Sequence, residues 1–237
     1  MHITWTSRGA FAGLALAALS TLAMAGTWGP DESTLETLSN DATQSLLISQ
    51  VLKDANERGR GRTARSTAVP RSHPVIAGSR GSVLARKLAA QYPPDRRAEV
   101  ERTFRDLLDA YHQIEDRFGV PRFDAGGAVA AFLAGSLMAY RNEDFPDAHF
   151  KPLVEQMRVV VNGNPAFTRA SPSARREMYE QMAILGMFMA STQMALKQQP
   201  DPAVAARMKR AAKGNLERFL GADADRVQIT AAGLLIQ

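Results

Sequence analysis

The sequence predicts an all-α fold, a helical bundle of about five to six helices in which two central apolar helices are surrounded by amphipathic ones. Apolar residues recur at three- and four-residue steps in several segments after residue 82. Two stretches, 125–140 and 182–196, are apolar on nearly every side, as helices buried all round are. No convincing pair of segments shows the alternation of paired strands.

Residues 1–25 are predicted to be a secretory signal peptide. Arg8 supplies a positive start, an apolar stretch follows, and Ala23-Met24-Ala25 fits the small-x-small cleavage pattern. The apolar stretch is short for a permanent membrane span, although an uncleaved anchor is the alternative. We therefore expect cleavage after Ala25, location in the periplasm or outside the cell, and no integral membrane segment in the mature protein.

The segment between the signal and the bundle has two parts. Residues 26–55 contain one predicted helix with a patchy leucine stripe, and residues 56–81 read as a disordered basic linker rich in Gly, Arg, Ser and Pro. Much of the net charge of +5 belongs to this region, because residues 53–82 hold seven basic and two acidic side chains. No aromatic residue is interleaved with these arginines, so we do not expect nucleic acid as a partner.

Residues 82–237 are predicted to form the bundle domain. Ser82 caps a short helix at 83–91, and an amphipathic helix follows at 96–118. The apolar stripe of this second helix comprises Val100, Phe104, Leu107, Leu108, Tyr111, Ile114 and Phe118.

The first central helix, 125–140, begins after the capping residue Asp124. Gly127, Ala131 and Gly135 follow one another at four-residue steps on one face of this helix. Small side chains on one face let another backbone come close, so we expect tight helix packing in the core.

Three further helices complete the bundle. The spacing predicts helices at 152–164, at 172–199 with Ser171 as cap and proline in the first position, and at 203–220. The tail, 225–237, is expected to pack as an extended segment.

The chain contains few of the groups that known chemistry requires. It has no cysteine, which excludes disulfides, thiolate metal ligands and thiol nucleophiles. It has no phosphate-binding glycine loop, dinucleotide fingerprint, H-E-x-x-H or G-x-S-x-G motif. His112 and His149 have carboxylates nearby in sequence, but His112 is read as a helix-flank residue and the acids near His149 as helix caps. We expect no cofactor, no metal site and no identifiable catalytic residue.

One polar cluster is the candidate site, at the ends of the two central helices. If these helices pack antiparallel, Arg141 or Arg158 can pair with Glu180 and lock the bundle. A carboxylate left unpaired there would instead have a raised pKa, as acid catalysts do. The full candidate set is Tyr140, Arg141, Asp144, Asp147, His149, Arg158, Tyr179, Glu180 and Gln181.

Four stretches carry a resemblance to a known family: "YPPDRRAEVERTF", "GAVAAFLAGSLMAYRNEDFPD", "VEQMR" and "MYEQMAILGMFMA". In these the chain resembles an uncharacterised family of exported bacterial proteins with a domain of unknown function, over about residues 84–236. The resemblance implies one domain that includes the tail, and it brings no activity, ligand or catalytic residue.

The favoured hypothesis is an exported module that binds another protein, for example one of the cell envelope. One alternative is a hydrolase-type enzyme using carboxylates near 141–149 and 177–181, and it requires a cleft that gathers them. A second alternative is a module for an apolar ligand or envelope lipid, and it requires a cavity between the central helices. A protein-binding module needs an exposed apolar patch. The oligomeric state does not follow from the sequence.

Overall fold

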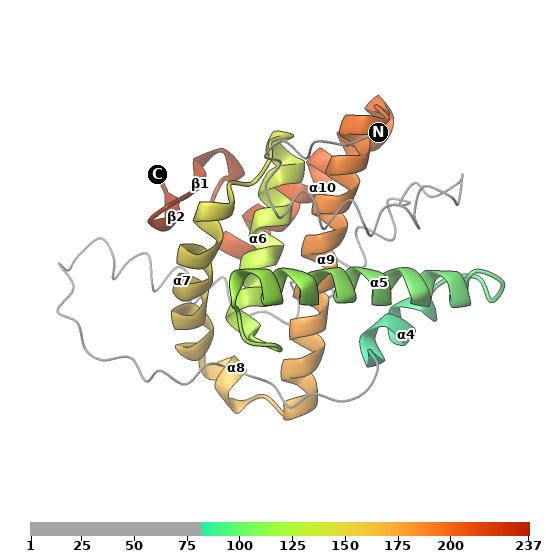
Figure 1. Cartoon of the computed structure of the whole chain (residues 1–237), viewed down its shortest axis with the longest axis horizontal. Helices are drawn as coiled ribbons and strands as arrows, with labels where there is room; N and C mark the ends of the chain where they lie inside the picture. Colours follow the sequence, from blue (N-terminus) through green and yellow to red (C-terminus); the bar gives the residue numbers. More distant parts are fainter. Residues whose placement is uncertain (1–81) are drawn as a thin grey trace, which may run out of the picture.

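Seven α-helices account for most of residues 82–237, which are the residues described in the computed structural model (Figure 1). The expected all-α bundle is confirmed. The predicted signal peptide, N-terminal helix and basic linker lie outside the described residues. The helices are α4 (Val83–Ala89), α5 (Arg97–Phe118), α6 (Ala125–Arg141), α7 (Phe150–Asn162), α8 (Pro165–Arg169), α9 (Pro172–Gln198) and α10 (Pro202–Leu220).

Side-chain caps fix where most of these helices begin. The side chains of Ser82, Asp124 and Ser171 each accept a hydrogen bond from a backbone N–H in the first turn of α4, α6 and α9. Helix α8 was not expected. Its start has the same local signals, because Asn164 caps it and Pro165 occupies the first position.

The central pair α6 and α9 forms the middle of the core, as the sequence predicts. Every residue from Ala125 to Tyr140 is buried. The two backbones touch, since a Cβ atom built on Gly135 would lie 2.1 Å from the carbonyl oxygen of Gly186, and one on Gly186 would lie 2.5 Å from that of Ala131. The expected close approach of another backbone is confirmed at Ala131 and Gly135, whereas Gly127 faces the side chains of Tyr111 and Val120.

The two central helices do not pack antiparallel. The ring of Phe123, just before α6, lies 5.6 Å from that of Tyr179, early in α9. At the other end Gln193 of α9 reaches Asn142, just after α6. The two helices are therefore parallel, and the antiparallel arrangement is wrong. The reason is connectivity: α7 runs back along α6, and the chain turns through α8 before it enters α9.

The remaining helices cover this pair. In Figure 1, α5 crosses in front of α6 and α9, with α4 beneath one end of it. Helix α7 contacts α6, and α10 contacts both α6 and α9, for example through the rings of Phe132 and Phe219, whose centroids are 5.1 Å apart. A short 3-10 turn, Asp147–His149, leads directly into α7, and a second one, Ala224–Arg226, follows α10.

The tail forms a β-hairpin, so the expectation that the chain contains no strand pair is wrong. Strand β1 (Val227–Thr230) pairs antiparallel with β2 (Gly233–Ile236). The turn lacks the Asn-Gly or Asp-Gly signal of two-residue hairpins, and Gly233 supplies a positive φ of 100° instead. Side chains of the bundle hold both strands: Gln156 of α7 bonds the N–H and the C=O of Leu234, and Arg141 donates to the carbonyl of Val227.

Candidate functional site

A pocket of about 260 Å³ lies on the surface where α4 meets the beginning of α9. Val83 and Leu84 of α4 and Pro172 of α9 give it an apolar lining, and Lys87, Arg176 and Glu177 contribute charged side chains. Val83 is 72% exposed, although most of the large apolar residues of the domain are buried. The site therefore combines an open apolar surface with charged groups.

Glu180 is part of this pocket and joins α4 to α9. It is 1% exposed. Its Oε2 atom accepts hydrogen bonds from the Ser82 hydroxyl at 2.7 Å and from the Leu84 N–H at 3.3 Å, and its Oε1 atom accepts one from Arg176 Nε at 2.7 Å. One carboxylate thus satisfies a free N–H at the start of α4 and is paired with a cation of its own helix.

The expected pairing of Glu180 with Arg141 or Arg158 is wrong. In the parallel arrangement Arg141 lies at the far end of α6, where it bonds the hairpin. Arg158 bonds Asp124 instead, with both its Nε and Nη2 atoms 2.6 Å from Asp124 Oδ2. Asp124 is fully buried and also caps α6, so this ion pair joins the start of α6 to α7.

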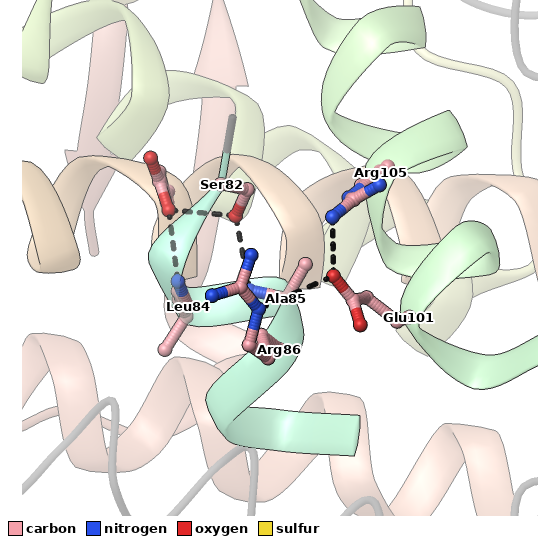
Figure 2. A network of polar contacts seen from close by, with 7 residues as sticks. Ser82, Leu84, Ala85, Arg86, Glu101 and Arg105 are labelled. Atoms are coloured by element: carbon pink, nitrogen blue, oxygen red, sulfur yellow. Dashed lines mark hydrogen bonds and ion pairs between the residues drawn. The ribbon is translucent and has the colours of Figure 1, made fainter. Parts of the chain in front are cut away.

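The opposite side of α4 is joined to α5. Figure 2 shows the first turn of α4 with Ser82 and Leu84 on one side, and Arg86 directed toward Glu101 of α5 on the other. Arg86 Nε lies 3.7 Å from Glu101 Oε1, and Arg105 bonds the same carboxylate. Because Arg86 is solvent-exposed, its ion pair with Glu101 contributes little to stability. The buried hydrogen bonds of Glu180 therefore contribute more to fixing α4 on the bundle.

The predicted polar cluster does not come together as one site. Tyr140 and Arg141 meet the C-terminal segment, where the Tyr140 hydroxyl donates to Asp225 at 2.6 Å. This hydrogen bond raises the pKa of Tyr140. Tyr179 and Glu180 lie at the other end of the bundle, near α5 and α4.

The residues between α6 and α7 are placed at the hairpin end too. Asp144 pairs with Lys197, near the end of α9, at 2.7 Å. Asp147 begins the 3-10 turn, and the ring of His149 packs edge-on against Phe145. Gln181 is buried in α9. The hydrolase alternative required a cleft that holds two or more of Arg141, Asp144, Asp147, His149 and Glu180. The structure separates Glu180 from the other four, so the part of this alternative that combined the carboxylates near 141–149 with Glu180 is wrong.

A second carboxyl, outside the predicted candidate set, lies buried where α5, α6 and α9 meet. Glu115 of α5 is 0% exposed. Its Oε1 atom accepts a hydrogen bond from the Tyr179 hydroxyl at 2.9 Å, and its Oε2 atom has no hydrogen-bond partner among residues 82–237. Burial raises the pKa of Glu115 to about 8, which the hydrogen bond from Tyr179 only partly opposes.

Aromatic rings enclose this carboxyl. The rings of Tyr111 and Tyr179 lie 5.9 Å apart, and His112 stacks near Tyr179. Phe123 packs against both His112 and Tyr179 and has a φ of +62°, which is uncommon for a bulky residue. Burial raises the pKa of the Tyr179 hydroxyl and lowers the pKa of His112. The sequence held a signal for this cluster: Glu115 lies four residues after Tyr111, so it interrupts the apolar stripe of α5.

Three further observations bear on the alternatives. No helix within residues 82–237 is both long and apolar enough to cross a bilayer. The same residues contain no group of three or more His, Asp or Glu side chains placed to hold a metal ion. At the level of Gly135 and Gly186 the central helices are in backbone contact, which leaves no space between them there for an apolar ligand.

These features define a small helical-bundle protein with a C-terminal β-hairpin, buried carboxyl groups at its helix junctions and an apolar surface pocket. The chain belongs to a family of unknown function, DUF6683, whose model matches residues 13–237. The match extends upstream of the region that carries the resemblance and includes part of the predicted signal peptide. Neither a curated protein nor a solved structure matches the chain.

Proposed function

We propose that the chain is exported and that its helical domain acts by binding another protein through the pocket between α4 and α9. The pocket carries this proposal because it joins an apolar lining to a charged margin, the arrangement found in protein interfaces. Its volume of about 260 Å³ accommodates one large apolar side chain, such as leucine or phenylalanine, together with the adjoining backbone. The proposed partner is therefore a protein that presents a protruding apolar side chain to this pocket.

The way the other polar groups are used supports binding over catalysis. Glu180, Asp124 and Arg158 join helices to one another, and Tyr140 and Arg141 hold the C-terminal segment. In each case the polar atoms bond other groups of the domain. The side chain of Val83, in contrast, is exposed and does not join helices in this way.

The binding proposal is tested by placing a photo-reactive side chain at Val83 of the full chain, in cells that produce it. Val159 on α7 is the matched control, because it is a valine that is also exposed, at 52%. We expect one protein to be cross-linked from position 83 and not from 159. That protein, purified, should bind the wild-type chain and lose at least tenfold in affinity for Val83→Asp. Equal cross-linking from both positions, or unchanged affinity of the variant, would refute the proposal.

Export is proposed from the sequence pattern at Ala23-Met24-Ala25. Its test is the mass and N-terminal sequence of the protein recovered from the medium and from the envelope of the producing cells. We expect a mature chain that starts at Gly26. An intact N-terminus on protein found only inside the cell would overturn this part.

A further inference from the structure

We propose that Glu115 acts as a proton-dependent clamp: while it holds its proton the junction of α5, α6 and α9 stays packed, and when the proton leaves, the junction loosens. This goes beyond partner binding and does not depend on it. The first observation is burial, because the carboxyl is fully covered and Oε2 has no hydrogen-bond partner among the described residues. A protonated carboxyl is far less costly to bury in this way than a carboxylate.

The second observation is that the neighbouring cations are bonded to other acids. Arg122 bonds Asp116, and Arg176 bonds Glu180. Arg158 bonds Asp124, whose negative charge also faces Glu115. Glu115 has no ion pair within residues 82–237. The charge of Arg122 and the backbone N–H of Phe123 favour the carboxylate but do not outweigh burial, so ionisation would leave a poorly compensated charge inside the bundle.

The third observation is that all three elements pack directly around this carboxyl. Tyr179 of α9 donates to it. The hydroxyl of Tyr111 on α5 lies against the backbone of α6, since a Cβ atom on Gly127 would be 2.8 Å from it. Phe123, which lies just before α6 and has a positive φ, contacts the ring of Tyr179 in α9. A charge at Glu115 therefore acts on the packing of three helices at once.

The titratable and charged groups around Glu115 determine the pH range of the clamp. Tyr111, Arg122, Asp124 and Tyr179 interact with Glu115 itself. Arg158 acts on its neighbour Tyr111, and Asp109, Asp116, Arg122 and Arg176 act on the nearby His112. Burial raises the pKa of Glu115 to about 8, well above its ordinary value of 4.5. Because the pKa of Glu115 is higher in the folded than in the unfolded state, protonated Glu115 contributes to the stability of the fold. This contribution is fully present below pH 4.5 and is lost as the pH rises through 8. His112 changes charge below this range because its pKa is lowered. Other groups that titrate between pH 7 and pH 9, such as the α-amino group, are common to the wild type and Glu115→Gln, so the ratio of the two proteins isolates Glu115.

The test is urea unfolding of the full chain at pH 7 and pH 9 for the wild type, Glu115→Gln and Glu99→Gln. Glutamine keeps the shape of a neutral carboxyl, and Glu99 is a half-exposed carboxylate on the same helix. The folding constant of the wild type relative to Glu115→Gln should fall about tenfold between pH 7 and pH 9. Glu99→Gln should follow the wild type. If the ratio of the wild-type folding constant to that of Glu115→Gln is the same at pH 7 and pH 9, the proposal is overturned.

An infrared titration of the wild type covers the case in which Glu115→Gln does not fold. The folded protein should show the carbonyl stretch of a protonated carboxyl at pH 7 and lose it by pH 9, with helix content retained. Tyr179→Phe removes the hydrogen bond to this carboxyl and should shift the position of the band. Absence of the band at pH 7 would refute a neutral buried carboxyl, and with it the clamp.

Discussion

Replacing Glu180 with glutamine tests whether this buried carboxylate fixes α4 onto α9. The carboxylate accepts three hydrogen bonds, from Ser82, Leu84 and Arg176. Hydrogen bonds to charged groups contribute about 1.5–3 kcal/mol each, and removing one member of a buried ion pair costs about 3–5 kcal/mol. Glutamine keeps one acceptor oxygen but loses the charge and one acceptor. We therefore expect Glu180→Gln to lower the free energy of unfolding by about 3 kcal/mol.

For a domain of this size, that loss corresponds to a fall in Tm of roughly 6 to 12 °C, measured by circular dichroism on the full chain. Hydrogen exchange should show a specific loss of protection in α4. The matched control is Glu177→Gln, one turn away, whose ion pair with Lys87 is exposed. Exposed pairs contribute about 0–1 kcal/mol, so the control should melt close to the wild type. If Glu180→Gln melts with the control and α4 keeps its protection, the structural role assigned to Glu180 is wrong.

Two further predictions concern glycine contacts and the hairpin. Gly186→Ala should destabilise the domain by about 1–3 kcal/mol or more in urea unfolding, because the new Cβ would lie 2.5 Å from the Ala131 carbonyl oxygen. The control is Gly214→Ala in α10, where the new Cβ would meet only the end of the Arg218 side chain, at 3.5 Å. This substitution should raise stability by about 0.5–1 kcal/mol, because alanine is favoured over glycine inside a helix. Equal effects at the two sites would contradict the backbone contact between α6 and α9. Gln156→Ala should raise hydrogen exchange at Leu234 while the helices keep their protection, and unchanged exchange there would show that this amide does not hold the strand.

The sequence predicted the helices better than their arrangement. Periodicity, caps and prolines are local signals, and they identified six helices and the two that form the centre. The direction of α9 relative to α6 depends on how the chain turns through α7 and α8. A helix at 152–164 was predicted, but local signals do not show that this helix, α7, packs back along α6, and it is this packing that makes the central pair parallel. The error over the partner of Glu180 follows from that.

The candidate site was predictable only in part. Glu180 stood out because it precedes a long apolar stretch, yet its partner Ser82 lies 98 positions away. Glu115 does not stand out because charged residues of both signs occupy most of the exposed face of α5, and only its position beside Tyr111 and Ile114 marks it as buried. The hairpin was missed because its two strands are four residues each and its turn has no strong signal.

The central claim is that α6 and α9 run parallel, because this places Glu180 beside α4 and Tyr179 beside Glu115. The chain contains no cysteine, so cysteines introduced in pairs can be cross-linked without interference. Asp144 and Lys197 form an ion pair at 2.7 Å, whereas Ser173 lies near the other end of α9, 24 residues before Lys197 and therefore about 36 Å from it at 1.5 Å per residue.

A short bis-maleimide should therefore cross-link Asp144→Cys/Lys197→Cys within the monomer and leave Asp144→Cys/Ser173→Cys unlinked. Cross-linking of the 144/173 pair in place of the 144/197 pair would show that α6 and α9 are antiparallel. The placement of Glu180 beside α4 and of Tyr179 beside Glu115 would then be wrong.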